Sequence, residues 1–479
     1  MNQIWTTLTF EQTPLSEWYR RSFLCRTIGT LEPWQQGSWL LQWSEGIGAI
    51  LVSLVLVLAP FAPTGLTGLL LFACGAFWAL LTLTTPVGRG VTPMQLLVTV
   101  YWSIATIATV FSPVRSAAFT GLVKLSLYLI FFALVVRVLR SIQWRNFILS
   151  VYLLTAMVVS AYGIRQAFLG ANSLATWVDP TSPLVGTTRV YSYLGNPNLL
   201  AGYLIPAVCL SLAAVFVWQG WGCKALAVGM SILNLSCLVL TYSRGGWIGC
   251  FVSLLVLSLL LIYWMSQHWS PFWQTWAIPV VLGTLAIVLI LAILTLEPLQ
   301  VRVMSIFAGR EDSSNNFRMN VWAAVLEMIH DRPWLGIGPG NNAFNHVYPL
   351  YQRPRFTALS AYSVLLEIIV ETGAIGFTCF LWLLLTTATQ GLRYIHQARS
   401  TLHRHLQSVD PKQVYWLMAG LATIAGMLGH GLVDTVWYRP QVSTLWWLTL
   451  GLIASYGATH SSGIQVSNIE PNLSDSKQV

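Results

Sequence analysis

The chain has 479 residues, of which 55% are hydrophobic and only 9% are charged. Soluble domains carry about 25% charged residues, so this composition excludes a water-soluble globular protein. It predicts an all-α polytopic membrane protein in contact with the lipid bilayer. The formal net charge is +9, but the basic residues lie in short stretches between apolar runs. They form no contiguous basic face, so we expect no nucleic-acid partner.

The first segment, residues 1–45, has no signal-peptide pattern, because charged residues interrupt every apolar run. We interpret it as a cytoplasmic amphipathic segment. Residues 46–460 form the predicted transmembrane domain, and residues 461–479 form a polar tail that we expect to be disordered. The seven cysteines make no CxxC pair, so we predict neither a disulfide framework nor a metal site, and no cofactor.

Apolar runs of about 20 residues, the length that crosses a bilayer as a helix, recur along the chain. We identify about twelve such runs, although the stretches 46–83 and 224–263 are nearly continuous, so eleven or thirteen spans also fit. The twelve begin near Gly46, Gly65, Pro93, Ala117, Asn146, Asn198, Lys224, Gly245, Trp276, Ser360, Val414 and Gln441.

Lysines and arginines in the short loops indicate the orientation, because such residues gather on the cytoplasmic side. With twelve spans, their distribution favours a cytoplasmic N-terminus and a cytoplasmic C-terminus. One polar segment, from about residue 297 to residue 360, is much longer than the other connections and then lies outside. Long structureless loops usually have a function, so we expect the working face of the protein there.

Several arginines gather on this predicted outer side. A guanidinium group binds phosphate or carboxylate through two parallel hydrogen bonds, so the set favours an outward-facing anion site. Each arginine could instead place its charged end at the membrane interface without binding anything. The set comprises Arg165, Arg189, Arg244, Arg318 and Arg439.

Turn-forming residues accompany these arginines. Asn198 follows Pro197 at the start of a span, where it can cap the helix or bind a ligand. Gly336, Gly338 and Gly340 can present backbone N–H groups to an anion, or simply form a tight turn. Both interpretations remain open for both groups.

Ionisable residues also lie within the spans, where they are candidates for function. His430 and Asp434 are four residues apart and share a helix face, and Asp434 could equally form a structural pair with Arg439 or another arginine. Glu367 and Glu371 are also four apart, so their like charges call for a nearby arginine or a shared proton.

Polar motifs in a fixed order connect these residues to a known family. They are residues 189–201 (RVYSYLGNPNLLA), residues 242–246 (YSRGG), residues 318–344, and the following Glu371-Thr372-Gly373. In order, spacing and placement they resemble the motifs of the O-antigen ligase superfamily of polytopic envelope proteins. The resemblance covers roughly residues 163–391.

The superfamily resemblance implies a chemistry. Its ligases transfer a glycan from a polyprenyl pyrophosphate to an acceptor outside the membrane, arginines hold the pyrophosphate, and a histidine assists. That histidine position is Tyr362 here, and a tyrosine is a poor general base at neutral pH. His346 is the other candidate catalytic residue in the loop.

Two further stretches, residues 356–363 and 430–442, are similar to the cyanobacterial inorganic carbon transporter B family, as are residues 5–60. This closer resemblance implies a protein of the bacterial inner membrane that handles a small anion such as bicarbonate. Glycan transfer is the alternative, and an accessory subunit without its own chemistry is the second alternative. No oligomeric state follows from the sequence.

The predicted orientation can be tested by cysteine labelling in intact cells. Cysteines introduced at Ser313 and Asn345, both in the long polar segment, should react with membrane-impermeant thiol reagents. The unaltered chain serves as the background control. Protection of both positions until the inner face is opened would reverse the orientation.

Overall fold

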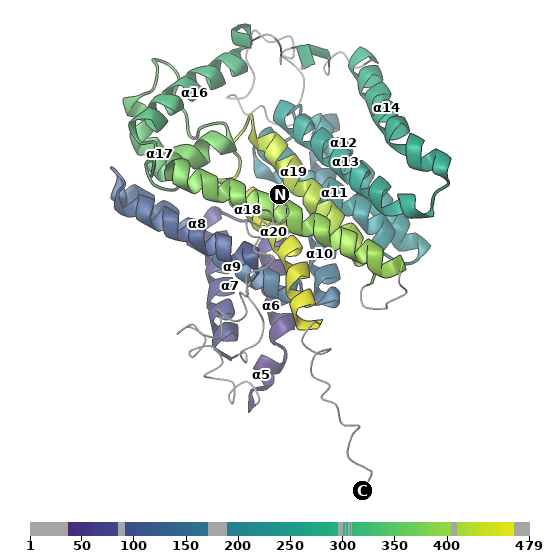
Figure 1. Cartoon of the computed structure of the whole chain (residues 1–479). Coiled ribbons are helices and arrows are strands. Elements are labelled where there is room, and N and C mark those ends of the chain that lie inside the picture. The colour runs from purple at the N-terminus through teal and green to yellow at the C-terminus, as the bar shows by residue number, and fades with distance from the viewer. Residues whose placement is uncertain are drawn as a thin grey trace.

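The computed structural model describes residues 37–84, 92–170, 189–295, 309–403 and 410–463, with a few positions between 300 and 307. Most of the predicted N-terminal segment (1–45) and of the polar tail (461–479) lies outside these residues. The described residues form helices and turns with no strand, which confirms the prediction of an all-α polytopic membrane protein. Figure 1 shows most of the helices packed as one bundle, with α16 and α17 at its upper left and α14 at the upper right.

The predicted spans correspond to helices, because each predicted start lies within a few residues of an observed one. These helices are α6 (Ser44–Leu58), α7 (Thr64–Thr84), α8 (Pro93–Val110), α9 (Arg115–Val138), α10 (Ile142–Leu169), α11 (Pro197–Val217), α12 (Trp221–Leu240), α13 (Arg244–Met265), α14 (Pro271–Thr295), α18 (Val364–His403), α19 (Gln413–Gly431) and α20 (Pro440–Gly463). Among the described residues, nine helices are long and apolar enough to cross a bilayer, namely α7 to α13, α18 and α19. A short helix, α5 (Trp39–Gln42), precedes them.

The long polar segment contains several helices, so the expectation of a structureless loop is wrong. It contains α16 (Ser313–Asp331), α17 (Asn341–Val347) and two short 3-10 turns, Gly309–Glu311 and Tyr348–Leu350. These elements share a small apolar core of their own, which includes Val321, Val325, Met328, Ile337 and Phe344. Burial of this core stabilises the folded part of the segment, residues 309–363, which covers one end of the bundle. These residues are called the cap below.

The centre of the bundle consists of α11 and α19, the two most buried of these spans. Glycines let α13 approach α19 closely. A Cβ atom on Gly249 would lie 2.5 Å from the carbonyl oxygen of Gly426, and one on Gly426 would lie 2.7 Å from that of Gly249. Small residues are the usual means of close helix packing in membranes.

The glycine-rich loop, residues 336–340, packs against a kink in α18. Gly373 adopts φ 67° and ψ −172° inside the helix, which leaves carbonyl groups of the preceding turn without their helical partners. The N–H groups of Ile337 and Gly338 donate to the carbonyl oxygens of Val370 and Glu371, each at 2.9 Å. The loop therefore replaces helical hydrogen bonds and fixes Glu371 in position.

Candidate functional site

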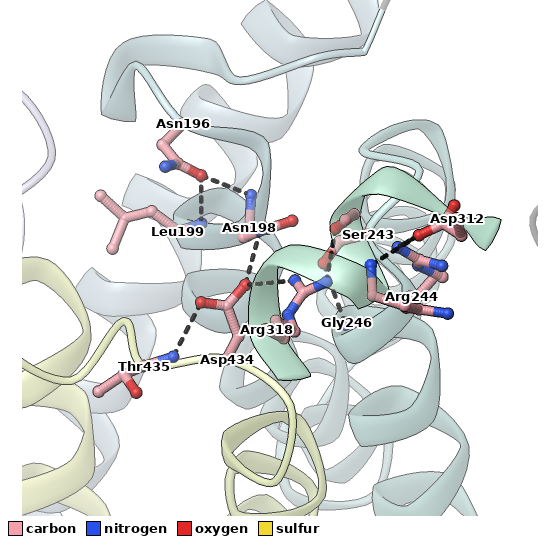
Figure 2. Close-up of polar contacts among 12 residues, drawn as sticks. Asn196, Asn198, Leu199, Ser243, Arg244, Gly246, Asp312, Arg318, Asp434 and Thr435 are labelled. Atoms are coloured by element: carbon pink, nitrogen blue, oxygen red, sulfur yellow. Dashed lines mark hydrogen bonds and ion pairs between the residues drawn. The ribbon is translucent and has the colours of Figure 1, made fainter. Parts of the chain in front are cut away.

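Three helices begin close together at the end of the bundle that carries the arginines (Figure 2). Asn196 caps α11, since its Oδ1 accepts from the N–H groups of Asn198 (2.8 Å) and Leu199 (3.2 Å). Ser243 caps α13 and Asp312 caps α16 in the same manner. Helix N-termini carry partial positive charge, so this end of the bundle favours negatively charged groups.

Asn198 does not cap its helix, so that interpretation is wrong. Asn196 takes the cap because Pro197 occupies the first helical position, which places Asn198 in the first turn. The Asn198 amide therefore faces the site. Its Oδ1 accepts from Arg189 Nη2 at 3.2 Å, and its Nδ2 donates to Asp434 Oδ2 at 2.6 Å.

Asp434 lies at the centre of the site, in the segment between α19 and α20 (Figure 2). Its Oδ2 is 3.6 Å from Arg318 Nη2, and its Oδ1 accepts from the backbone N–H of Thr435 at 2.8 Å. The two charged side chains are largely buried, with 16% of Arg318 and 7% of Asp434 exposed. Donors from α11, α16 and the segment itself therefore surround one carboxylate.

The other two arginines of the site contact neighbouring groups. Arg189 Nε donates to the carbonyl oxygen of Thr241 at 3.1 Å, which ties the start of α11 to the end of α12. Arg244 Nη2 lies 3.0 Å from Asp312 Oδ1. Asp312 was not among the predicted site residues, although an acidic residue before a helix is a recognisable capping signal.

His430 lies beside Asp434 in the packed interior. A Cβ atom on Gly202 would lie 3.2 Å from His430 Cε1, and one on Gly245 would lie 2.9 Å from Cδ2. The glycines of α11 and α13 thus make room for the imidazole ring. Neither ring nitrogen has a hydrogen-bond partner among the described residues.

Tyr362 precedes α18 and adopts φ 50°, with its ring edge-on to Phe317 at 5.3 Å between centroids. Burial, with the nearby charge of Asp434 second, raises the pKa of Tyr362 to about 12. The phenol therefore stays protonated at neutral pH and can donate a hydrogen bond, but it cannot accept a proton as a base. His346 is exposed, and its Nδ1 is 2.8 Å from the carbonyl oxygen of Asn342 on the same helix.

The remaining predicted residues lie apart from Asp434 or have structural contacts. The Gly338 N–H donates to the protein backbone, so it is not available to an anion in this state. Gly340 packs against α9, where a Cβ atom would lie 2.6 Å from the Cα of Gly121. Asp434 pairs with Arg318, while the Arg439 guanidinium lies 5.1 Å from the ring centre of Tyr438.

A cavity of about 680 Å³ adjoins the site, between α7, α9, α17, α18 and α20. Glu367, Glu371, Gly340 and Arg439 line it. Thr435 also lines it, and the backbone of this residue holds Asp434. The cavity and the arginine site are thus neighbours that share one chain segment.

Comparison with known proteins supports the superfamily. Residues 229–381 match the family model described as O-antigen ligase, and no curated protein matches the chain. The matched range includes Arg244, Arg318 and Tyr362 but not Asn198 or Asp434. Together with the apolar helices it supports a multi-pass membrane protein of the ligase superfamily. The closer likeness to inorganic carbon transporters stays a prediction.

The substitution Asp434→Asn tests whether this carboxylate holds the site together. Removal of one partner from a buried ion pair costs about 3 kcal/mol, because the other charge stays buried without compensation. We expect a lower melting temperature for the purified protein in detergent.

Asp331→Asn is the matched control, since Asp331 lies on α16 but its side chain is 55% exposed. It should melt close to the unaltered protein. Equal melting of Asp434→Asn and the unaltered protein would show that Arg318 does not depend on this carboxylate.

Proposed function

We propose that this membrane protein binds a small planar oxyanion, with bicarbonate as the candidate, and takes part in its movement across the membrane. The observation that carries the proposal is the set of donors around the Asp434 carboxylate. Asn198 Nδ2, Arg318 Nη2 and the Thr435 N–H together surround two oxygens on one carbon. Bicarbonate presents the same planar arrangement of oxygens, so the same donors suit it.

The anion can bind to these donors only after the Asp434 side chain has moved away from them. Asp434 lies on an irregular segment between two helices, so a shift of its side chain breaks no helical hydrogen bond. The anion that replaces it still faces Arg318 and the helix N-termini, which favour negative charge. Asp434 then acts as an internal counter-ion that the transported anion displaces.

Tyr362 fits this role better than a catalytic one. Its pKa of about 12 keeps the phenol protonated at neutral pH, and it lies near Asp434 and Arg318. A neutral hydroxyl adds a hydrogen-bond donor for an oxyanion without adding charge. The predicted outward orientation of this end of the bundle would expose the site to the source of the anion.

Flux measurements in liposomes test the proposal. The purified protein should carry labelled bicarbonate into vesicles faster than empty vesicles admit it. Arg318→Lys should lower that flux at least tenfold, because the point charge of lysine lacks the planar fork. Arg355→Lys is the control, since Arg355 is exposed in the cap, and it should leave the flux unchanged. Equal flux in Arg318→Lys would exclude Arg318 from the anion site.

Glycan transfer is the second candidate, and the match to the O-antigen ligase model favours it. In that reaction the arginines would hold a polyprenyl pyrophosphate instead of bicarbonate. An accessory role, the third possibility, would leave the pure protein inactive in both assays.

Tyr362→His distinguishes the two candidates. Imidazole titrates near neutral pH and differs from phenol in reach, so the substitution should lower bicarbonate flux and create no glycan transfer. The unaltered protein and the Tyr362→His variant should both be assayed with a polyprenyl-linked sugar as well as with bicarbonate. Robust transfer by the unaltered protein, or a gain of transfer in Tyr362→His, would favour the ligase reaction.

A further inference from the structure

His430 lies in the last turn of α19, inside the bundle, and is only 1% exposed. Its ring packs against glycines of two other helices. A Cβ atom on Gly202 of α11 would lie 3.3 Å from Nδ1, and one on Gly245 of α13 would lie 3.4 Å from Nε2. Neither nitrogen has a hydrogen-bond partner within the part of the chain that the structure describes. Glycine has no side-chain donor or acceptor, so the residues that enclose the ring do not satisfy it.

An imidazole ring without partners is unfavourable in either tautomer. The neutral ring always carries one N–H donor and one acceptor nitrogen, and protonation makes both nitrogens donors. Buried polar groups in native proteins are almost always satisfied, whereas an apolar side chain would fill the same space without any unsatisfied atom. Packing alone therefore does not account for a histidine here, and the ring should gain a partner in another state of the site.

Other groups near the arginine site also have atoms without a partner among the described residues, namely Arg318 Nε, Thr435 Oγ1 and Glu367 Oε2. A guanidinium keeps its proton at neutral pH, and a threonine hydroxyl does not titrate there. The imidazole of His430 and the carboxyl group of Glu367 are thus the two groups of this set that can exchange a proton. Because His430 is fully enclosed, a proton is the ligand that it can bind without any free volume.

Asp434 is placed to become the partner of the ring. It follows His430 by four residues, and the N–H of Val433 donates to the carbonyl oxygen of His430 at 3.3 Å, so the chain continues in a turn between them. Asp434 and Arg318 are the charged groups whose fields act on the ring. In the observed state the Asp434 carboxylate faces Arg318 and Asn198 instead. A carboxylate attracts an imidazolium, while a move towards Glu367 would bring two acidic groups together.

We propose that His430 binds one proton for each anion that the arginine site takes up. This inference rests on the proposed function, in which the anion displaces Asp434 from Arg318. The displaced carboxylate meets the ring, a proton from solvent binds the free ring nitrogen, and the imidazolium N–H donates to Asp434. One N–H bond forms, and no covalent bond of the protein breaks. The charge of the proton balances that of the anion, which would otherwise stay uncompensated in a largely buried site.

Proton uptake gives anion binding a defined pH dependence. Two ligands that favour each other's binding do so reciprocally, so the affinity for the anion should rise as the pH falls. One proton per anion corresponds to a change in affinity of about tenfold per pH unit, over the range in which the ring of the unliganded protein is neutral.

Isothermal titration calorimetry of the full chain in detergent tests the proposal. The probe is formate, a planar oxyanion that stays ionised at neutral pH and does not exchange with carbon dioxide as bicarbonate does. Titrations in two buffers with different heats of ionisation count the protons that are taken up with each formate. We expect about one proton per formate, and binding about tenfold weaker at about pH 8 than at about pH 7.

The two proposals fail in different ways in this experiment. Formate binding without proton uptake would overturn the proton site of His430 and leave the anion site in place. Failure of both formate and bicarbonate to bind would overturn the anion site and the proton site together.

His430→Gln removes the titrating ring and keeps a polar side chain. It should bind formate without proton uptake and with an affinity that does not change with pH. His330→Gln is the matched control, since the His330 side chain is 89% exposed on α16, and it should keep the uptake. Unchanged uptake in folded His430→Gln would overturn the proposal.

Glu367→Gln tests the other group that can exchange a proton. Uptake should persist in this variant, and its loss would assign the proton to Glu367 and overturn the role of His430. If His430→Gln fails to fold, the proton counts of the unaltered protein and of Glu367→Gln decide between the two groups.

Discussion

The Asp434 carboxylate is the contact on which the arginine end of the molecule depends. It joins Asn198 of α11, Arg318 of the cap and the segment between α19 and α20, which are three distant parts of the chain. Without the carboxylate, the Arg318 guanidinium would lie largely buried beside further cationic groups, an arrangement that costs much free energy. The cap that carries Arg318 is thus tied to the bundle by the same carboxylate that lies at the centre of the arginine site.

A second constraint comes from close backbone approach. The cap meets the bundle at Gly121 and Gly340, where a Cβ atom on Gly121 would lie 1.8 Å from the carbonyl oxygen of Pro339. It meets α18 at Gly373, where a Cβ atom would lie 2.1 Å from the carbonyl oxygen of Trp334. The glycines that the sequence offered as an anion cradle therefore have a packing role in this state.

The arginine site and the neighbouring cavity differ in polarity. The arginine site is polar, largely buried and complementary to one carboxylate, which suits a small oxyanion. The cavity has mainly apolar and aromatic walls. Thr435 belongs to both, since its N–H donates to Asp434 and the residue also lines the cavity.

The sequence by itself determined the helices and the arginine motifs, because the length and apolarity of a span are local properties. The starts of α8, α11 and α13 follow directly from Thr92-Pro93, Asn196-Pro197 and Ser243. Even so, local reasoning considered Asn198 and not Asn196 as a cap of α11, because both residues flank the proline and either type of position can cap a helix.

Only the tertiary structure decided which charges meet. Asn198 and Asp434 are 236 positions apart, and the pairing of Asp434 with Arg318 instead of the adjacent Arg439 follows from how α16 packs over the bundle. The helical cap, the buried ring of His430 and the cavity beside Thr435 likewise depend on packing between distant segments. Hydropathy and spacing indicate which residues are buried. The partner of a buried charge depends on which helices are in contact, and a local sequence pattern does not predict such contacts.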